Sequence, residues 1–482
     1  MDNSILGSSS PEPTPAPQSA SDSAPAKAGK FKLTKLERRW AMYDAGNSAI
    51  YMFLILIAVS IGDLAAGTRF ADDPTNTMSL FNGISGALVA VMGPILGAIA
   101  DNKGRKKPLF MFFVFLGVAG CLLSLLTNFA SLSTSPWAFF VPFAICMLMI
   151  LIGLGGSLLF YDSMIGDITT EARSDNVSSR GFAAGYIFSL IPFAICLAIY
   201  YFFMTPSYST DVYGTSVQGG YVLLRAAITA SLALSGLWWL GWTLPLLKSY
   251  RQLTGVDPVK HQIRDAFRKL GKTFKELKRY RFAFLFMLAF FFYINGVNTV
   301  IALSATYAQQ ILKDVVSSNL LNVFLIGALM GTQVISCIFS IIFGNLSKRF
   351  GAKLLITISV VGYLAFVIYG VFMKSLVDFF ILAAGIGIFQ GGIQALSRSY
   401  FSKLAPAEKQ SEFFGLYDIF NKSSNFLGSL LYYALSSAMV NSGIDVTKSA
   451  RISVGCLSVF FVIGMVLLLL LPKNHADEVV SE

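Results

Sequence analysis

The feature that most limits what this chain can fold into is a succession of long apolar stretches that runs through nearly its whole length. A helix needs about 20 apolar residues to cross a hydrocarbon core of about 30 Å. Because 55% of the residues are hydrophobic and only 13% are charged, a water-soluble fold is excluded. The stretches predict twelve membrane-spanning helices, at residues 40-63, 79-100, 108-127, 136-160, 181-204, 221-246, 281-304, 318-343, 353-373, 375-397, 411-436 and 450-471.

A basic turn between two of these stretches occurs twice in the sequence. A chain that uses the same turn in each half is typical of a duplicated bundle. We therefore predict an all-α integral membrane protein whose twelve transmembrane helices form two parallel six-helix repeats. The first copy of the turn reads Gly97-Ala-Ile-Ala-Asp101-Asn-Lys-Gly104-Arg105-Lys106-Lys107, and the second reads Gly344-Asn-Leu-Ser-Lys348-Arg349-Phe-Gly351-Ala-Lys353.

The remaining segments divide the chain around the two repeats. Residues 1-36 are rich in Ser, Pro and Ala and contain no apolar core of a cleavable signal, so we expect a disordered cytoplasmic tail. We expect the N-terminal bundle at 37-246, a basic cytoplasmic linker at 247-280, the C-terminal bundle at 281-473 and a short cytoplasmic tail at 474-482.

The distribution of basic residues predicts the orientation. Lys and Arg are retained on the cytoplasmic side of a membrane, and here they precede the first stretch and then gather in the even-numbered loops. We expect both termini in the cytoplasm and the protein in the cell membrane. Much of the net charge of +11 lies in the linker. Two interpretations of residues 260-280 stay open: an amphipathic helix on anionic lipid, or a solvated linker whose charge enforces the topology.

Several functional classes lack the residues they need. The five cysteines are scattered singly, and the two histidines lie outside the apolar stretches, so neither a metal site nor a cofactor is expected. No phosphate-binding loop of an ATP-driven pump is present. The acidic cluster of Asp162, Asp167 and Glu171 has no base or metal partner in the sequence, which argues against an enzyme. We expect a monomer that does not bind nucleic acid.

Two sets of motifs resemble known families. The first basic turn resembles the signature Gly-x-x-x-Asp-x-x-Gly-Arg-Lys of the major facilitator superfamily. Other segments are similar to the vacuole-effluxer-like family, relatives of the fungal autophagy-linked amino-acid exporter. The resemblance implies a secondary transporter and favours amino acids as substrates. The segments are Trp40-Ala-Met-Tyr43-Asp44-Ala-Gly46-Asn47-Ser48-Ala, Arg180-Gly181-Phe182-Ala-Ala-Gly185-Tyr186, Gln394-Ala-Leu-Ser397-Arg398-Ser399 and Glu412-Phe413-Phe414-Gly415-Leu-Tyr417.

The same resemblance implies a cytoplasmic gate. In the superfamily the Asp of the turn meets the amino end of helix 11 and nearby arginines when the cytoplasmic side closes. That interaction implies contact between Asp101 and residues 411-415. Arg398 is expected at the cytoplasmic end of its helix, as a gate or an anchor. The expected gate residues are Gly97, Asp101, Gly104, Arg105, Lys106, Arg180 and Arg398.

Polar side chains inside the stretches are candidates for substrate binding or coupling, because a charged residue at the bilayer centre costs at least about 2.5 kcal/mol. Asp44 has two interpretations: a proton- or cation-coupling carboxylate, or a first-turn acid that gates the inner mouth. Asp418 and Lys422 have the spacing of a helical ion pair. That pair is either a satisfied internal contact or a switch at which a substrate carboxylate or a proton competes.

Two further helices carry polar candidates. Gln390 and Gln394 are one turn apart beside small glycines, so they can line a cavity while the glycines allow close helix approach. Asn295-Gly296-Val-Asn298 predicts a loosened helix that offers backbone groups to a ligand, with interhelical amide contacts as the alternative. The substrate or coupling candidates are Asp44, Asn47, Tyr51, Asn295, Asn298, Gln390, Gln394, Asp418, Lys422 and Asn425.

These observations predict a facilitative or proton-coupled transporter that works by alternating access on a small polar metabolite, with amino acids favoured. Two alternatives stay open. A lipid or drug exporter would have an apolar cavity, and a non-transporting membrane sensor would keep the cavity without turnover.

Overall fold

The computed structural model describes residues 31–65, 68, 74–130, 136–204, 218–253, 255, 280–312 and 318–472. The side chains of some helical positions inside these ranges are outside the description, including those of Lys422 and Asn425. The expected amphipathic helix of the linker also lies outside the described residues. Within the described ranges the chain is helical and no β-strand occurs.

The first half of the chain forms a bundle of long helices joined by short turns. Its elements are α1 (Lys35–Leu64), α2 (Pro74–Ala100), α3 (Lys106–Leu123), η1 (Ser124–Leu126), α4 (Thr127–Ala130), α5 (Pro136–Ser163), α6 (Ile165–Ile168), α7 (Glu171–Phe188), α8 (Leu190–Met204) and α10 (Gln218–Ser249).

The second half forms a corresponding bundle. Its elements are α12 (Arg281–Leu312), α13 (Ser318–Phe350), α14 (Ala352–Val371), α15 (Leu376–Leu404), η2 (Ala407–Lys409), α16 (Gln410–Asn441), α17 (Val446–Cys456) and α18 (Ser458–Leu469).

Each of the twelve predicted stretches falls on one of these helices or on two or three consecutive ones. Among the described residues, nine helical segments are long and apolar enough to cross a membrane. The protein is therefore an all-α membrane protein. Twelve crossings remain the prediction from the sequence, because α1, α2 and α16 are not among those nine segments.

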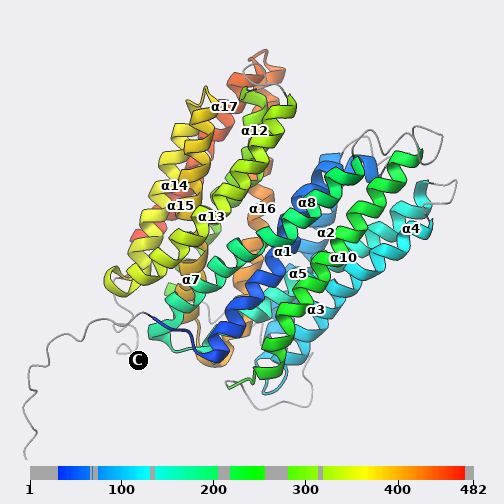
Figure 1. Ribbon diagram of the computed structural model, residues 1–482. Helices are drawn as coiled ribbons and strands as arrows, with labels where there is room; N and C mark the ends of the chain where they lie inside the picture. The colour runs from blue at the N-terminus through cyan, green and yellow to red at the C-terminus, as the bar shows by residue number, and fades with distance from the viewer. Residues whose placement is uncertain are drawn as a thin grey trace, which may run out of the picture.

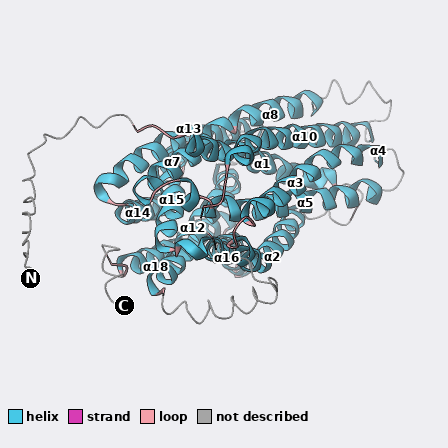
Figure 2. Cartoon of the chain, turned by 90° about the horizontal axis from the view of Figure 1, so that it is seen from below, coloured by secondary structure: helices cyan, strands magenta, loops and turns pink. Residues whose placement is uncertain are grey.

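The two bundles lie side by side, with the first half on the right and the second half on the left of Figure 1. They meet where α2 packs against α16 and where α7 leans across to α13 and α15. Seen from below, α1 lies near the centre of the molecule (Figure 2), where it packs mainly against α10 and α7. This junction is the part of the fold most relevant to function, because two halves of similar architecture meet there.

Two local features differ from expectation. Helix α1 begins at Lys35, inside the segment expected to be a disordered tail, because Thr34 and Glu37 cap it reciprocally: the Glu37 carboxylate accepts from the Thr34 N–H at 2.7 Å, and the Thr34 hydroxyl accepts from the Glu37 N–H at 3.2 Å. The predicted loosening of α12 at Gly296 is wrong. The helix runs unbroken from Arg281 to Leu312, and a Cβ at Gly296 would lie 2.6 Å from the Phe461 ring, so the glycine serves close packing instead.

The glycines of α15 allow the close helix approach that the sequence predicts. A Cβ on Gly391 would lie 2.3 Å from the Ser336 carbonyl oxygen of α13, and a Cβ on Gly387 would lie 3.0 Å from the Thr332 carbonyl oxygen. Any side chain at these positions would push the two helices apart. The close contacts at these two glycines fix the position of α15 against α13. They therefore also determine which neighbouring residues the polar side chains further along α15 can contact.

Candidate functional site

The candidate site lies at the lower end of Figure 1, where α1 begins and where the α2–α3 turn and the α15–α16 turn come together. We call this the lower end. Helix α15 stops before Pro406, and Ala405 has the extended conformation that a following proline requires (φ −79°, ψ 133°). Helix α16 then starts with Lys409 as its N-cap, whose side chain makes no capping hydrogen bond. The first N–H groups of α16 are thus open to an acceptor from elsewhere.

Asp101 of the other half supplies that acceptor. Its carboxylate accepts from the Ser411 N–H and from the Glu412 N–H, each at 2.9 Å. A carboxylate at a helix amino end also gains from the positive end of the helix dipole. Gly97, one turn earlier, makes the approach possible, because a Cβ there would lie 2.4 Å from the Ser411 carbonyl oxygen.

The environment of Asp101 changes its titration. The residue is only 7% exposed, and this burial raises the pKa of the carboxyl to about 6 although the Lys106 charge and the N–H groups of Glu412 and Ser411 act in the opposite direction. The carboxyl thus titrates closer to neutral pH than an exposed Asp does.

Arg398 of α15 forms the second connection and is almost completely buried, at 2% exposed. Its guanidinium donates to Asp44 at 3.2 Å, to Asp162 at 3.0 Å and to the hydroxyl of Ser178 at 3.0 Å. It also donates to the Ser178 carbonyl oxygen at 3.1 Å. One cation of the second half therefore sits between two carboxylates of the first half.

Aromatic rings enclose the same guanidinium. Its central carbon lies 4.7 Å from the Trp40 ring centroid, 5.3 Å from Tyr161 and 4.3 Å from Phe182. Each distance is within the range of a cation–π contact. The Tyr161 hydroxyl donates to Asp44 at 2.9 Å and so fixes that carboxylate. We call Trp40, Asp44, Tyr161, Asp162, Ser178 and Phe182 the guanidinium cage.

Further contacts between the halves surround these two. Lys403 pairs with Asp175 at 2.8 Å. Further hydrogen bonds between the halves include those from Asn176 to the Gly344 carbonyl oxygen at 2.6 Å, from Ser178 to the Ala395 carbonyl oxygen at 2.7 Å, from Ser340 to the Ser179 carbonyl oxygen at 2.7 Å and from Tyr186 to Gln394 at 2.6 Å.

The segment before α1 adds a contact to both halves. The Phe31 ring lies 4.5 Å from the Arg173 guanidinium and 4.9 Å from that of Arg180, both on α7. It also lies 4.5 Å from the Lys348 ammonium on α13. Glu37 anchors the segment through its ion pair with Arg173 at 2.7 Å.

The remaining members of the expected gate have other places. Gly104 has a positive φ of 76°, which a tight turn between α2 and α3 requires. Arg105 is exposed. Lys106 lies inside the first half, where it pairs with Asp167 at 3.0 Å and donates to the Ser163 carbonyl oxygen. It therefore holds the turn in place through contacts within the first half.

The structure supplies partners for two residues of the acidic cluster Asp162, Asp167 and Glu171. Asp162 and Asp167 have no partner nearby in the sequence, but the structure gives Arg398 to Asp162 and both Lys106 and Tyr250 to Asp167. Asp162 and Arg398 stand 236 positions apart. A pairing between elements so distant leaves no trace in local spacing.

The substrate candidates lie on α1, α12, α15 and α16. Asn47 and Asn295 are buried, and the Asn47 Nδ2 and Asn295 Oδ1 atoms have no hydrogen-bond partner among the described atoms. Gln390 and Asp418 are 8% exposed. Asn298 is half-buried, and Tyr51 is 40% exposed.

The largest misses of the sequence analysis are the cage rings, Ser178, Phe31 and the Lys403–Asp175 pair. Trp40 and Phe182 belong to segments that carry the family resemblance, but nothing in their spacing points to Arg398. A usable signal is that aromatic residues stand close in sequence to intramembrane acids, as Trp40 does to Asp44 and Tyr161 to Asp162.

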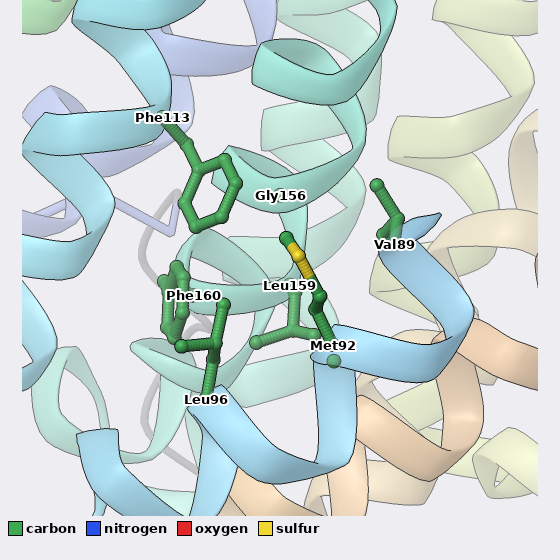
Figure 3. Close-up of a pocket in the computed structure, with 8 residues that line it drawn as sticks. Val89, Met92, Leu96, Phe113, Gly156, Leu159 and Phe160 are labelled. Atoms are coloured by element: carbon green, nitrogen blue, oxygen red, sulfur yellow. The ribbon is translucent and has the colours of Figure 1, made fainter. Parts of the chain in front are cut away.

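A small apolar cavity lies apart from this site. It has a volume of about 10 Å³ between α2, α3 and α5, and its lining includes Met92, Phe113, Leu159 and Phe160 (Figure 3). Such a space holds about one water molecule and offers no polar side chain to it. The lower-end junction is therefore the better candidate site. Among the described residues no group of three or more metal-ligating side chains occurs.

Two helical halves joined at one end by charged and polar contacts define the fold of a major facilitator superfamily transporter. Solved structures agree with this class. The fucose transporter FucP in the outward conformation has a TM-score of 0.63 at 13% identity, covering 90% of this chain and 97% of that chain. A bacterial homologue of the iron transporter ferroportin has a TM-score of 0.62 at 14% identity, covering 91% and 99%.

The sequence comparisons identify the family. The model of the vacuole effluxer Atg22-like family matches residues 166–479. The MFS-type transporter YxiO of Bacillus subtilis (strain 168) is 35% identical over 454 residues, which cover 93% of this chain and 97% of that protein. Autophagy-related protein 22 of Kluyveromyces lactis is 24% identical over 401 residues, covering 78% and 73%. The chain belongs to the vacuole effluxer Atg22-like family of membrane transporters.

Proposed function

We propose that the protein is a secondary transporter that moves a small polar metabolite, with amino acids favoured, by alternating access. The observation that carries this proposal is the buried Arg398 of one half held by Asp44 and Asp162 of the other. The Coulomb attraction in a buried ion pair is largely offset by the cost of removing both partners from water, so the net free energy with which such a pair holds two bundles together is modest. Such a contact suits a gate at the lower end.

The polar groups beyond this gate support a polar substrate. Buried amides normally have hydrogen-bond partners. The Asn47 Nδ2 and Asn295 Oδ1 atoms have none among the described atoms, so they can donate to and accept from a bound solute. Amino acids carry both an ammonium and a carboxylate, which match amide groups and a carboxylate such as Asp418. The proposal includes the option that transport is coupled to protons, with Asp44 or Asp418 as the residue that binds the proton.

We also propose that the lower end faces the cytoplasm of a cell-membrane protein. Exposed basic residues stand at this end, among them Lys103, Lys348 and Arg349, as expected of loops kept on the cytoplasmic side. Anionic lipid is the partner proposed for the linker at 260-280.

Counterflow of labelled amino acids in proteoliposomes tests the function. In a background without native cysteines, Asp175→Cys and Lys403→Cys can be joined across the lower end by a short bifunctional thiol reagent. We expect uptake before cross-linking, loss of uptake after it and recovery when the link is removed. Each single-cysteine variant is the control and should keep its uptake under the same reagent. Unchanged uptake through a cross-linked lower end would contradict alternating access there, and absence of counterflow for every solute would favour a sensor.

A further inference from the structure

The guanidinium cage is complete within one half of the protein. Every contact of the Arg398 guanidinium described above comes from α1, α5 or α7, all in the first half. Helix α15, which carries Arg398, belongs to the second half. The first half therefore forms a receptor for a guanidinium group, and the second half supplies its occupant.

Two carboxyl groups of the cage share one cation. Asp44 and Asp162 face one guanidinium, and Asp418 of α16 is close enough to act electrostatically on Asp162. The two carboxyl groups thus form an acidic site around a single buried cation. Such a site continues to attract a cation when Arg398 is elsewhere.

The shape of the cage favours a planar cation. Nε and both terminal nitrogens of Arg398 have separate acceptors, which are the Ser178 hydroxyl, Asp162 and Asp44. The rings of Trp40 and Phe182 cover the guanidinium face. A guanidinium presents its donors in one plane and stacks on aromatic rings, whereas an ammonium is a compact, strongly hydrated point charge.

Separation of the halves at the lower end would withdraw Arg398 from this cage. The carboxylates and the rings would remain together, because the Tyr161 hydroxyl holds Asp44 and the Trp40 and Tyr161 rings stack at 4.6 Å. A buried carboxylate left without its cation is costly. A dissolved cation of the same shape would relieve that cost.

We propose that the guanidinium cage binds the guanidinium group of a solute that enters from the lower end, and that Arg398 is its built-in competitor. The inference rests on the proposed function, since it needs a lower end that opens. It narrows the ligand class to compounds with a guanidinium, such as a basic amino acid or an alkylguanidine. Solute binding and closure by Arg398 exclude each other, so the solute stabilises the open lower end.

Binding to purified protein, measured by titration calorimetry, tests this inference with arginine, agmatine and citrulline. Citrulline has nearly the shape of arginine but carries a neutral urea in place of the guanidinium. We expect arginine and agmatine to bind and citrulline not to bind. Arg398→Gln removes the competitor, and if the open state is at most about a tenth of the population, the apparent Kd for arginine should fall roughly tenfold or more.

Two control variants distinguish the loss of competition by Arg398 from a general weakening of the contacts between the halves at the lower end. Lys403→Gln breaks a lower-end ion pair outside the cage and should lower the apparent Kd for arginine less than Arg398→Gln does. The double variant Asp44→Asn with Arg398→Gln removes the competitor together with one cage carboxylate. It should therefore not show the lower apparent Kd for arginine that is expected of Arg398→Gln alone. Equal binding of citrulline and arginine, or an equal gain from Lys403→Gln, would overturn the inference.

A measurement on the wild-type protein keeps the test valid if Arg398→Gln fails to fold. Spin labels at the exposed Ala172 and Arg349 report the distance between the halves at the lower end. Arginine should lengthen that distance and citrulline should leave it unchanged. If neutral amino acids exchange in counterflow while arginine changes neither distance nor uptake, the inference fails and the proposed function stands. If no solute exchanges and the distance never changes, both fail.

Discussion

At the scale of single residues, Gly181 decides whether the guanidinium cage can close. A Cβ at this position would lie 2.7 Å from the Asp44 Oδ2 atom and 3.1 Å from the Arg398 Nη2 atom. The ion pair therefore forms over a glycine on α7, against which Arg398 packs directly. The contact with Arg398 exists only in the closed lower end, because Arg398 reaches this place from the other half, whereas Asp44 belongs to the same half as Gly181.

Gly181→Ala should shift the protein toward an open lower end. Overpacking of a tight contact costs about 1–3 kcal/mol, which changes the ratio of open to closed states by about 5- to 150-fold. The spin-label distance between Ala172 and Arg349 measures this ratio. Gly241→Ala is the matched control, since a Cβ there would meet nothing within 4 Å. A wild-type distance distribution in Gly181→Ala would show that the cage tolerates the methyl group.

At the scale of elements, the start of α16 depends on a residue of the opposite half. Its N-cap residue, Lys409, provides no side-chain acceptor, and Asp101 takes that place through Ser411 and Glu412. An element capped from outside is stabilised only while the two halves meet. The capping contact therefore couples the order of the first turn of α16 to closure of the lower end.

Acidification should favour that closure through Asp101. Its pKa is about 6 in the closed state against the ordinary 3.8, so the closed state takes up a proton that a solvated carboxyl does not bind until lower pH. This contribution of Asp101 to the stability of the closed state is fully present below about pH 4 and is lost as the pH rises through about 6. Between pH 7 and pH 5 the ratio of closed to open states should rise about tenfold.

The spin-label distance at the two pH values measures this shift, and Asp101→Asn provides the comparison. Lys106 is the charged group with the largest effect on Asp101, and it stays in place through its own pair with Asp167. Asp101→Asn should lose most of the shift. If this variant keeps the full pH response of the wild type, the response belongs to other carboxyl groups.

At the scale of the whole molecule, the described ion pairs between the halves all lie at the lower end. They pair the acids of the first half, Asp44, Asp162 and Asp175, with the bases of α15, Arg398 and Lys403. The polarity runs in one direction, acid on the first half and base on the second. This arrangement lets the halves recognise each other without a permanent apolar seam at that end.

Reversal of one pair tests that polarity. Lys403→Asp should place two carboxylates together and favour the open lower end, and Asp175→Lys should place two ammonium groups together with the same effect. The double variant restores the pair with its direction exchanged. A double-mutant cycle on the spin-label distances should give a coupling of about 0.5–3 kcal/mol. Additive effects of the two substitutions would mean that this pair does not contribute to closure.

The sequence by itself determined the class of fold, because apolar length and the alternation of basic loops are local properties that a membrane imposes on each segment separately. The repeated turn indicated two halves, and the resemblance of that turn to the superfamily signature implied the contact of Asp101 with the start of α16. Small residues of α15, such as Gly387 and Gly391, indicated close packing correctly, since their effect lies within one helix face.

Only the tertiary structure decided which charges meet. Asp162 lacked a partner in the sequence and Arg398 was expected at a helix end, yet the two are paired in a buried cage. Their pairing depends on where α5 and α15 lie relative to each other, which follows from packing between elements that are far apart along the chain. A linear pattern encodes which face of a helix is polar, but the neighbour that this face meets depends on the assembled bundles.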